Sequence, residues 1–273
     1  MYIATKTAAT TPEDFWKDLE TSLEKLQTDY IDVYQFHCVG QCYKPGDGTG
    51  MYECMLEAKK QGKIRHIGVT AHKIGIAYEC VESGLYETMQ FPFSYLSGPQ
   101  EIKLVQMCQE ANMGFVCMKG LAGGLISNSR AAMAYMCQYP DILPIWGIQK
   151  EKELEEWLSY MSDTPCMDEE TAAFIAKEQE ELSGDFCRGC GYCMPCPQGI
   201  TINQCARVSL MLRRALSEAW LNAYWQKEMA KIETCLHCNA CKAKCPYELD
   251  TPALLQKNLE DYKNVLAGKT KVQ

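Results

Sequence analysis

Two short runs of cysteine are the part of this sequence in which residue type and spacing point most directly to chemistry. The first run reads CRGCGYCMPCP over residues 187–197, and the second reads CLHCNACKAKCP over residues 235–246. Cysteine thiolates are strong metal ligands, and closely spaced thiols converge easily on one centre. The two runs therefore predict two sites at which thiolates bind a metal centre.

The second run has the spacing C-x2-C-x2-C-x3-C-P, which bacterial ferredoxins use for a 4Fe-4S cluster. The first run has x2 before its last cysteine, a small departure. In two-cluster proteins the cysteine before proline ligates the other cluster. This crossover rule predicts two ligand sets, which are Cys187, Cys190, Cys193 and Cys245 for one cluster and Cys235, Cys238, Cys241 and Cys196 for the other.

Zinc is the alternative metal, because paired C-x2-C motifs also form four-cysteine zinc sites. One zinc ion needs only four ligands and does not require three cysteines at successive x2 spacings followed by Cys-Pro. The spacing therefore favours iron–sulfur clusters. Other cysteines lack this spacing. Most of them are expected to be small buried hydrophobes without a ligand role: Cys38, Cys42, Cys54, Cys80, Cys108, Cys117, Cys137, Cys166 and Cys205.

Composition and charge set the context for these sites. The chain has 273 residues, of which 47% are hydrophobic and 23% charged, as in a globular protein. The N-terminus lacks the apolar segment of a signal peptide, and no apolar run is long enough for a transmembrane helix. We therefore expect the 17 cysteines in a reducing cytoplasm, in an anaerobe, and no membrane partner. The net charge of −8 argues against a nucleic-acid partner, because phosphates attract basic surfaces.

Short apolar runs alternate with helical patterns before the cysteine runs. Thr11 followed by Pro12 predicts the start of a helix, and Gly62 the end of the next one. Strands separated by helices, recurring every ~25–33 residues, are typical of a parallel sheet or barrel. The predicted strands cover residues 2–6, 31–37, 64–70, 88–91, 114–118 and 143–149.

The stretch between the two cysteine runs is predicted to be helical, because apolar residues recur there at three- and four-residue steps. Arg213 and Arg214 are expected on its solvated face, and residues 178–181 form a charged helix face before the first run. We expect two domains, a βα-barrel portion over residues 1–165 and a helical, cluster-binding domain over residues 166–273. The apolar positions are Ile202, Cys205, Val208, Leu212, Ala215, Leu216, Trp220, Tyr224 and Trp225.

Several motifs follow one another along the first part of the chain. They are IATK at 3–6, SLEKLQTDYIDVYQFH at 22–37, GKIRHIGVT at 62–70, LAGGL at 121–125, and Gly147 followed by LEE at 154–156. In this order they resemble the aldo/keto reductase family, and with the cysteine-rich tail they resemble its branch with a C-terminal dicluster domain. The resemblance implies a (β/α)8 barrel that reduces carbonyls with a nicotinamide hydride at the carboxyl ends of its strands.

The family uses an aspartate, a tyrosine, a lysine and a histidine, and its lysine lowers the pKa of the tyrosine that protonates the carbonyl oxygen. The resemblance implies that Lys6 is this lysine and that His37 orients the carbonyl. Lys150 and the backbone N–H groups of the 123–124 loop are expected to meet the phosphates of NADP(H) or NAD(H), unless they are only a solvated helix face and a loop. The positions matching family cofactor contacts are Thr70, His72, Gln90, Lys119, Gly123, Gly124, Gln149, Lys150 and Glu156.

The family's aspartate and tyrosine belong to two βα units that this sequence does not contain. The expected fold is therefore a (β/α)8 barrel lacking its first two βα units, with about six strands, plus a mostly α-helical ferredoxin-like domain. Three explanations stand beside one another: a fragment or misplaced start codon, a shortened homologue completed by another chain, or a relic that keeps only the clusters. Two open sheet edges predict instability or a homo-oligomer.

Two functions follow from these patterns. The first is an oxidoreductase that couples NAD(P)H-linked carbonyl or alcohol chemistry to electron transfer through two 4Fe-4S clusters, with a small carbonyl or alcohol substrate and an electron-transfer protein as partner. The second is a catalytically dead barrel fragment that serves as an iron–sulfur electron-transfer or interaction module. An in-frame extension upstream of Met1 that encodes two more βα units would separate them.

Overall fold

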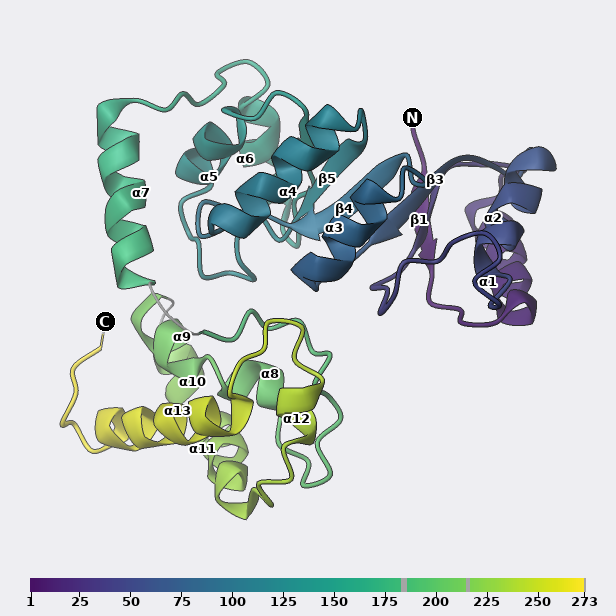
Figure 1. The fold of residues 1–273 in the computed structure, drawn as a ribbon. Helices are drawn as coiled ribbons and strands as arrows, with labels where there is room; N and C mark the ends of the chain where they lie inside the picture. The colour runs from purple at the N-terminus through teal and green to yellow at the C-terminus, as the bar shows by residue number, and fades with distance from the viewer. Residues whose placement is uncertain (183–185, 215–216, 273) are drawn as a thin grey trace. The chain divides into compact units, whose positions relative to one another are not determined.

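The computed structural model describes residues 1–182, 186–214 and 217–272. The chain forms two compact units (Figure 1). The first, called the sheet unit below, consists of Met1–Gly120 and Tyr135–Leu158, and the second, the helical unit, consists of Leu121–Ala134 and Ser159–Gln273. A segment that precedes the last strand in the sequence thus belongs to the helical unit. The domain boundary after residue 165 stays a prediction.

The sheet unit contains one sheet of six parallel strands in sequence order. The predicted fold, consecutive βα units of a barrel followed by a helical region, is confirmed. Lys6 lies beside Gln35, and Gln35 lies beside Gly68, so the carboxyl ends of the strands share one edge. The strands are β1 Ala4–Thr7, β2 Ile31–Phe36, β3 Ile64–Thr70, β4 Thr88–Pro92, β5 Gly114–Met118 and β6 Ile142–Pro144.

The predicted strand over residues 143–149 is wrong from residue 145 onward, because β6 ends at Pro144. Proline has no N–H with which to continue a ladder. The Ile145 N–H still donates to the Cys117 carbonyl at 2.9 Å. After it, Trp146 stacks on Trp157 with ring centroids 4.0 Å apart, so the chain leaves the sheet for a packing contact with a helix.

Helices follow the strands of the sheet unit as the sequence predicts. The Thr11 hydroxyl accepts the Asp14 N–H at 3.3 Å and so caps the first helix. Gly62 follows the second helix with φ 75°, a left-handed conformation that glycine adopts without a Cβ clash. The helices are α1 Pro12–Leu26, α2 Met51–Lys60, α3 Ile74–Glu82, α4 Pro99–Glu110, α5 Ser129–Met136, which belongs to the helical unit up to Ala134, and α6 Glu151–Ser159, which ends at the border of the sheet unit.

The hydrophobic core of the sheet unit lies between α1 and one face of the strands. Phe15 is fully buried, and its ring lies 5.7 Å from that of Tyr34 and 6.3 Å from that of Phe36. Side chains alternate across a strand, so Gln35 points to the opposite face. The Thr7 hydroxyl donates to Asp18 of α1 at 2.7 Å, and Lys6 therefore also belongs to that opposite face.

The stretch between the cysteine runs is helical, as the sequence predicts, and it consists of several short helices. The Asn258 side chain explains the first break: its amide donates to the Ala206 carbonyl at 3.1 Å, and its oxygen accepts the Ser209 N–H at 2.9 Å. It thereby satisfies backbone groups that a helix end leaves unpaired. The elements are α7 Glu169–Glu181, α8 Ile202–Cys205, α9 Val208–Arg214, α10 Glu218–Leu221, α11 Ala223–Ala230, the 3-10 helix η1 Lys231–Thr234, α12 Ala240–Ala243 and α13 Thr251–Leu266.

Of the predicted apolar positions, four lie in the core of the helical unit, Trp220 and Trp225 pack against it, and Tyr224 is 61% exposed, whereas Ala215 and Leu216 lie outside the described residues. This core includes Ile202, Cys205, Val208, Leu212, Met229, Ile232, Leu255, Leu259 and Tyr262.

One of the two arginines expected on the solvated face is mostly withdrawn from solvent. The Arg214 side chain is only 11% exposed and forms a two-pronged ion pair with Glu178 at 2.6 and 2.7 Å. Arg214 also donates to the Leu125 carbonyl at 2.9 Å. Arg213, in contrast, is largely exposed and pairs with Asp261. Two-pronged pairs of low exposure fix geometry well, so Arg214 joins α7, α9 and the segment around Leu125 within the helical unit.

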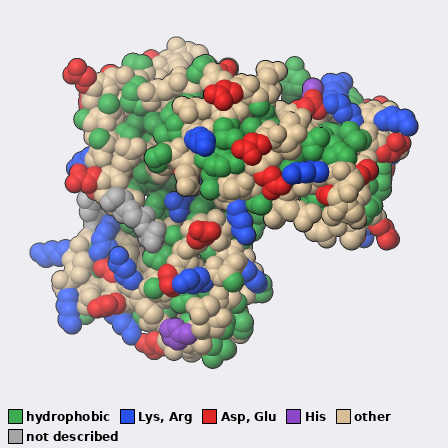
Figure 2. Space-filling model, viewed as in Figure 1, with side chains coloured by type: hydrophobic (Ala, Val, Ile, Leu, Met, Phe, Trp, Pro, Cys, Tyr) green, Lys and Arg blue, Asp and Glu red, His purple; other side chains and the backbone are tan. Residues whose placement is uncertain are grey.

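The surface carries charges of both signs. Figure 2 shows acidic and basic side chains interspersed over the drawn face, with hydrophobic side chains between them. None of the helices in the described part of the chain combines the length and the hydropathy that crossing a membrane requires.

Candidate functional site

The eight cysteines of the two runs line two pockets in the helical unit. The first pocket has an empty volume of about 340 Å³. The cysteines that line it are Cys187, Cys190, Cys193 and Cys245, together with Arg188, Gly191, Pro246, Tyr247, Leu249, Thr251 and Leu254.

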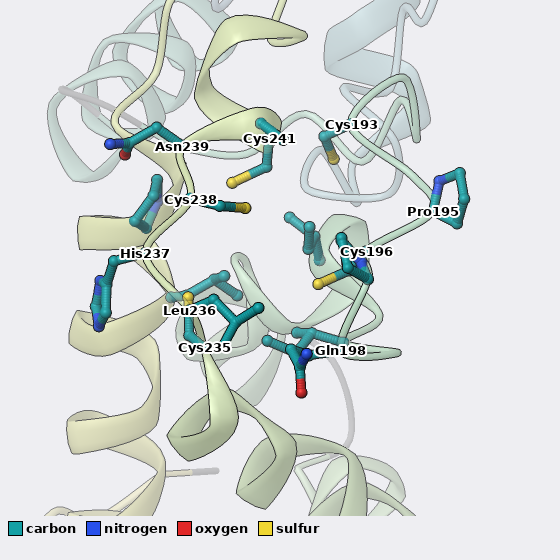
Figure 3. Close-up of a pocket in the computed structure, with 16 residues that line it drawn as sticks. Cys193, Pro195, Cys196, Gln198, Cys235, Leu236, His237, Cys238, Asn239 and Cys241 are labelled. Atoms are coloured by element: carbon teal, nitrogen blue, oxygen red, sulfur yellow. The ribbon is translucent and has the colours of Figure 1, made fainter.

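The second pocket has an empty volume of about 440 Å³ and is lined by Cys196, Cys235, Cys238 and Cys241, and also by Cys193, which lines both pockets. Figure 3 shows the sulfurs of Cys196, Cys238 and Cys241 turned toward the interior, whereas His237 and Asn239 point away from it. Each run thus contributes three cysteines to one pocket and its last cysteine to the other. This is the grouping that the crossover rule predicts.

The two loops share a backbone pattern that their sequences do not reveal. Gly189 and Gly191, on either side of Cys190, have φ values of 67° and 83°. His237 and Asn239, on either side of Cys238, have φ values of 50° and 59°. Left-handed backbone is usual for glycine, tolerated by asparagine and uncommon for histidine. Both loops therefore hold their second cysteine between two left-handed residues.

The pattern continues after the last cysteine of each run. Gly199, three residues after Cys196, has φ 67°, and Glu248, three residues after Cys245, has φ 55°. Each of these residues is followed by a buried aliphatic side chain, that of Ile200 or Leu249. The equivalent position is a glycine after the first run and a glutamate after the second. Residue types alone therefore do not indicate this structural repeat.

The donor set of these pockets fits iron–sulfur clusters. Burial raises the pKa of Cys193 to about 12 and also raises the pKa of Cys187 and of Cys241, because thiolates lose hydration there. A bound iron centre removes this penalty by coordinating the thiolate directly. Among the described residues, no three His, Cys, Asp or Glu side chains converge closely enough to hold a single metal ion. A four-iron cluster takes its four thiolates from around a pocket rather than from one point.

The two pockets differ in exposure. Cys187 of the first pocket is buried, and the rings of Phe186 and Tyr247 lie 4.7 and 4.5 Å from the Arg188 guanidinium. Cys238 of the second pocket is exposed, and the neighbouring Leu236 is 64% exposed. A centre in the second pocket is therefore closer to solvent.

In the sheet unit, the structure brings Lys6 and His37 to the ends of neighbouring strands. Lys6 lies in β1, and the His37 N–H donates to the carbonyl of Thr7, the last residue of β1, at 2.8 Å. Partial burial, and then the Lys6 charge, lower the pKa of His37. Both effects disfavour an imidazolium, so the neutral imidazole of His37 dominates at pH 7.

His72 lies at the same edge of the sheet, two residues after β3. Its side chain is buried, and burial together with the charges of Lys119 and His37 lowers its pKa to about 3. The imidazole is therefore neutral at pH 7. Lys119 follows β5 directly with φ 58°, so Lys6, His37, His72 and Lys119 bring polar groups from four strands to one edge.

Thr70, the last residue of β3, and Gln90, in the middle of β4, are both buried. The Thr70 hydroxyl accepts the Cys38 N–H at 2.7 Å and so shapes the loop after β2. The Gln90 side-chain amide donates to the Met118 sulfur at 3.4 Å. Because a thioether is a weak hydrogen-bond acceptor, the Gln90 amide can give up its contact with Met118 and donate to a ligand instead. The contact of Gln90 with the carboxamide of a nicotinamide stays a prediction.

A carboxylate lies at the expected phosphate position. The backbone N–H groups of Gln149 and Lys150 donate to Glu153 at 2.7 and 3.2 Å, and these bonds lower the pKa of Glu153. Such N–H groups before a helix are also where a phosphate binds. Glu153 was not singled out from the sequence, although a glutamate at the third helical position is a capping signal. Glu156 lies on the same helix and is exposed.

Gly123 and Gly124 belong to the helical unit, whereas the other candidate cofactor residues belong to the sheet unit. The Gly124 N–H donates to the Leu121 carbonyl at 2.8 Å. The Gly123 carbonyl accepts a bond of 2.6 Å from Arg207. The loop is therefore organised by its own turn and by an arginine that the sequence analysis did not select.

Comparison with known proteins adds the family. The model described as "Aldo/keto reductase family" matches residues 1–138, half of the chain. The chain belongs to the aldo/keto reductase family. The model described as "4Fe-4S dicluster domain" matches residues 186–250, so this family member carries a dicluster domain after its reductase portion. The predicted resemblance is confirmed in both parts. The individual ligand and catalytic roles stay predictions.

The curated relatives match less than half of the chain. The NADH-specific methylglyoxal reductase of Escherichia coli is 28% identical over 120 residues, which are 43% of this chain and 36% of that protein. Aldo-keto reductase YhdN of Bacillus subtilis is 30% identical over 112 residues, 41% of this chain and 33% of that protein. The chain thus spans about a third of the length of these relatives.

Among solved structures, aldo-keto reductase AKR11C1 from Bacillus halodurans in its holo form superposes with a TM-score of 0.55 at 21% identity. The match covers 65% of this chain and 72% of that one. At this identity the likeness concerns the fold.

Proposed function

We propose that this aldo/keto reductase family member joins NAD(P)H-linked carbonyl or alcohol chemistry in its sheet unit to electron transfer through two 4Fe-4S clusters in its helical unit. The observation that carries the proposal is the division of eight cysteines between two pockets in the crossed sets of the dicluster pattern. When bound, each cluster supplies one-electron transfer, whereas a nicotinamide exchanges electrons in pairs.

In the helical unit, the proposed ligands are Cys187, Cys190, Cys193 and Cys245 for one cluster and Cys196, Cys235, Cys238 and Cys241 for the other. The exposure of Cys238 and Leu236 supports the second pocket as the one that exchanges electrons with a protein partner. A chain with 17 cysteines, eight of them proposed cluster ligands, fits a reducing compartment such as the cytoplasm.

In the sheet unit, Lys6 and His37 are the proposed catalytic residues, and Gln90 is the proposed contact to the carboxamide of NAD(P)H. His72, neutral and buried, lines the site as a hydrogen-bonding group. A small carbonyl substrate is supported by the relative named as a methylglyoxal reductase. Residues 1–273 contain no counterpart of the family's aspartate and tyrosine. We therefore propose carbonyl reduction for a longer form of the chain, or for a complex with another chain, that adds these two residues to Lys6 and His37.

The first experiment measures the clusters themselves. Purified without oxygen, the chain should be brown, contain about eight irons and eight sulfides, and absorb near ~400 nm with bleaching by dithionite. A colourless anaerobic preparation that contains zinc instead would contradict the proposal.

The second experiment measures coupling. Cys190→Ser and Cys238→Ser should each reduce NADPH-dependent electron transfer to a viologen dye, because each removes a ligand of one cluster. Cys137→Ser, at an exposed cysteine outside both runs, is the control and should leave the rate unchanged. Wild-type rates in both cluster variants would show that reductase chemistry and clusters are not coupled.

A pure electron-transfer module is the second candidate, favoured by the Glu153 carboxylate at the expected phosphate position. This alternative predicts clusters that dithionite reduces, with no saturable binding of NADPH or NADH in a fluorescence titration.

A further inference from the structure

Arg207 is a buried cation in the helical unit that the proposed ligand sets leave unused. It lies between α8 and α9 and is only 5% exposed. One of its terminal nitrogens donates to the Gly123 carbonyl at 2.6 Å and lies 3.2 Å from the Met211 sulfur. Its Nε is buried without a hydrogen-bond partner among the described residues. A buried guanidinium is costly unless an anion lies close to it.

The other terminal nitrogen lies against the first cysteine loop. A Cβ added to Gly189 would lie 2.4 Å from this nitrogen, and a Cβ added to Gly123 would lie 2.9 Å from it. Both glycines have φ 67°. Real Cβ atoms do not approach other atoms this closely, so two glycines make the space that the guanidinium fills. The Gly189 N–H meanwhile faces the Cys187 sulfur at 3.4 Å, on the side of the first pocket.

The second cysteine loop has no equivalent of this arrangement. His237 is the counterpart of Gly189, with the same left-handed backbone, and its side chain points away from the pocket into the exposed surface (Figure 3). Among the described residues, no Asp or Glu carboxylate lies within ion-pair distance of Arg207. Arg213 and Arg214, at the end of α9, each have a carboxylate partner. The anionic group that the geometry offers Arg207 is therefore the thiolate cluster of the first pocket.

We propose that Arg207 is the built-in counter-charge of the cluster held by Cys187, Cys190, Cys193 and Cys245, and that it raises the reduction potential of this cluster relative to its neighbour. The inference rests on the proposed cluster binding. Reduction adds one electron to the cluster and makes or breaks no bond, so the reduced form is more negative by one charge. A fixed cation in a poorly hydrated site stabilises that form, and net charge and hydrogen bonds are known to set cluster potentials. Arg207 is thus a positioning and tuning residue rather than a ligand.

The test is an EPR-monitored redox titration of the full chain with dithionite as the electron donor. The wild-type protein should give two couples, and Cys238→Ser, which keeps the first pocket intact, identifies the couple of the first cluster. In Arg207→Met the charge is removed with little change in side-chain length, and this couple should move to lower potential while the other couple moves less. Arg207→Lys, which keeps a positive charge, should move it less than Arg207→Met.

Two further variants keep the test decisive. Arg207→Gln retains a donor for the Gly123 carbonyl, replaces Arg207→Met if that variant does not fold, and should lower the same couple. Arg213→Gln, a charge loss on the exposed side of α9, should leave both couples in place. An unchanged first couple in the neutral variants, or equal shifts of both couples, would overturn the inference. A wild-type protein without iron or EPR signals would instead overturn the proposed function before any variant is compared.

Discussion

The two compact units assemble their candidate sites in opposite ways. In the helical unit, seven consecutive residues, 187–193, supply three proposed ligands, and the second run does the same. In the sheet unit, Lys6 and Lys119 come from opposite parts of a segment that crosses five strands. A site made from one loop keeps its residues together whatever surrounds it, whereas a strand-edge site exists only when the whole sheet forms.

The electrostatics of the two sites differ as well. In the helical unit burial raises the pKa of thiols such as Cys193 and holds them neutral until a metal centre binds. At the strand edge, burial and neighbouring cations lower the pKa values of His37 and His72 and hold imidazoles neutral. The site in the helical unit therefore binds a cationic centre through its thiols, whereas the charged groups of the strand-edge site are Lys6 and Lys119. The following changes test this contrast.

The largest expected effect is the loss of a whole cluster, and it tests whether the runs exchange their last cysteines. Cys245→Ala should reduce the iron content from about eight to about four per chain. Because Cys245 lines the first pocket, the EPR signal that remains should match that of Cys190→Ala. A match with Cys238→Ala would instead assign Cys245 to the second cluster. Cys205→Ala, at a buried cysteine outside both runs, is the control and should keep both clusters.

A core substitution tests whether the sheet unit can be weakened without the cluster sites. Phe15→Ala removes a fully buried ring that packs on Tyr34 and Phe36 and should lower the free energy of unfolding of the sheet unit by about 3–5 kcal/mol. Urea titrations followed by circular dichroism measure this change, and absorption near ~400 nm reports the clusters. Leu26→Ala, at a residue that is 44% exposed on the same helix, should change stability by about 0.5 kcal/mol or less. Equal early loss of both signals in Phe15→Ala would contradict separate units.

His72 should make the sheet unit sensitive to acid. Its pKa of about 3 in the folded chain lies below the ordinary value of 6.5, so the unfolded chain binds the proton more tightly. The contribution of neutral His72 to the free energy of unfolding is fully present above about pH 6.5. It decreases as the pH is lowered toward 3, by up to about 2 kcal/mol at pH 5. Thermal melts at pH 7.5 and 5 measure this fall, which should be smaller in His72→Asn. An identical fall in both proteins would show that His72 does not carry the proton linkage.

The smallest expected effect concerns the phosphate position of the sheet unit. Glu153→Gln removes a negative charge that occupies the N–H groups of Gln149 and Lys150, and should tighten NADPH binding about 2- to 5-fold. Fluorescence titration measures the dissociation constant. Glu155→Gln, at an exposed residue of the same helix, should change it little. Weaker binding in Glu153→Gln would mean that the carboxylate shapes the site rather than blocking it.

Elements with a strong local signal were predictable from the sequence. β3 and β5 begin and end at the predicted residues, because each is a short apolar run bounded by turn residues. The last strand was not, since Pro144 ends the ladder before the apolar pattern does. The division of the helical stretch into short helices was not predictable for a different reason: Asn258, which bonds to the backbone between α8 and α9, lies 52 residues beyond Ala206 in the chain. No local pattern contains such a contact.

The sequence by itself determined the eight cysteines, the crossed grouping expected of them, the βα order and the family. These depend on spacing and on periodicity, which are properties of neighbouring residues. Only the tertiary structure decided that Arg214 is mostly withdrawn from solvent and paired with Glu178, that Glu153 occupies the N–H groups before α6, and that Arg207 lies against Gly189. Burial and charge pairing depend on residues far apart in the chain, and their energies arise only when the folded packing removes these groups from water.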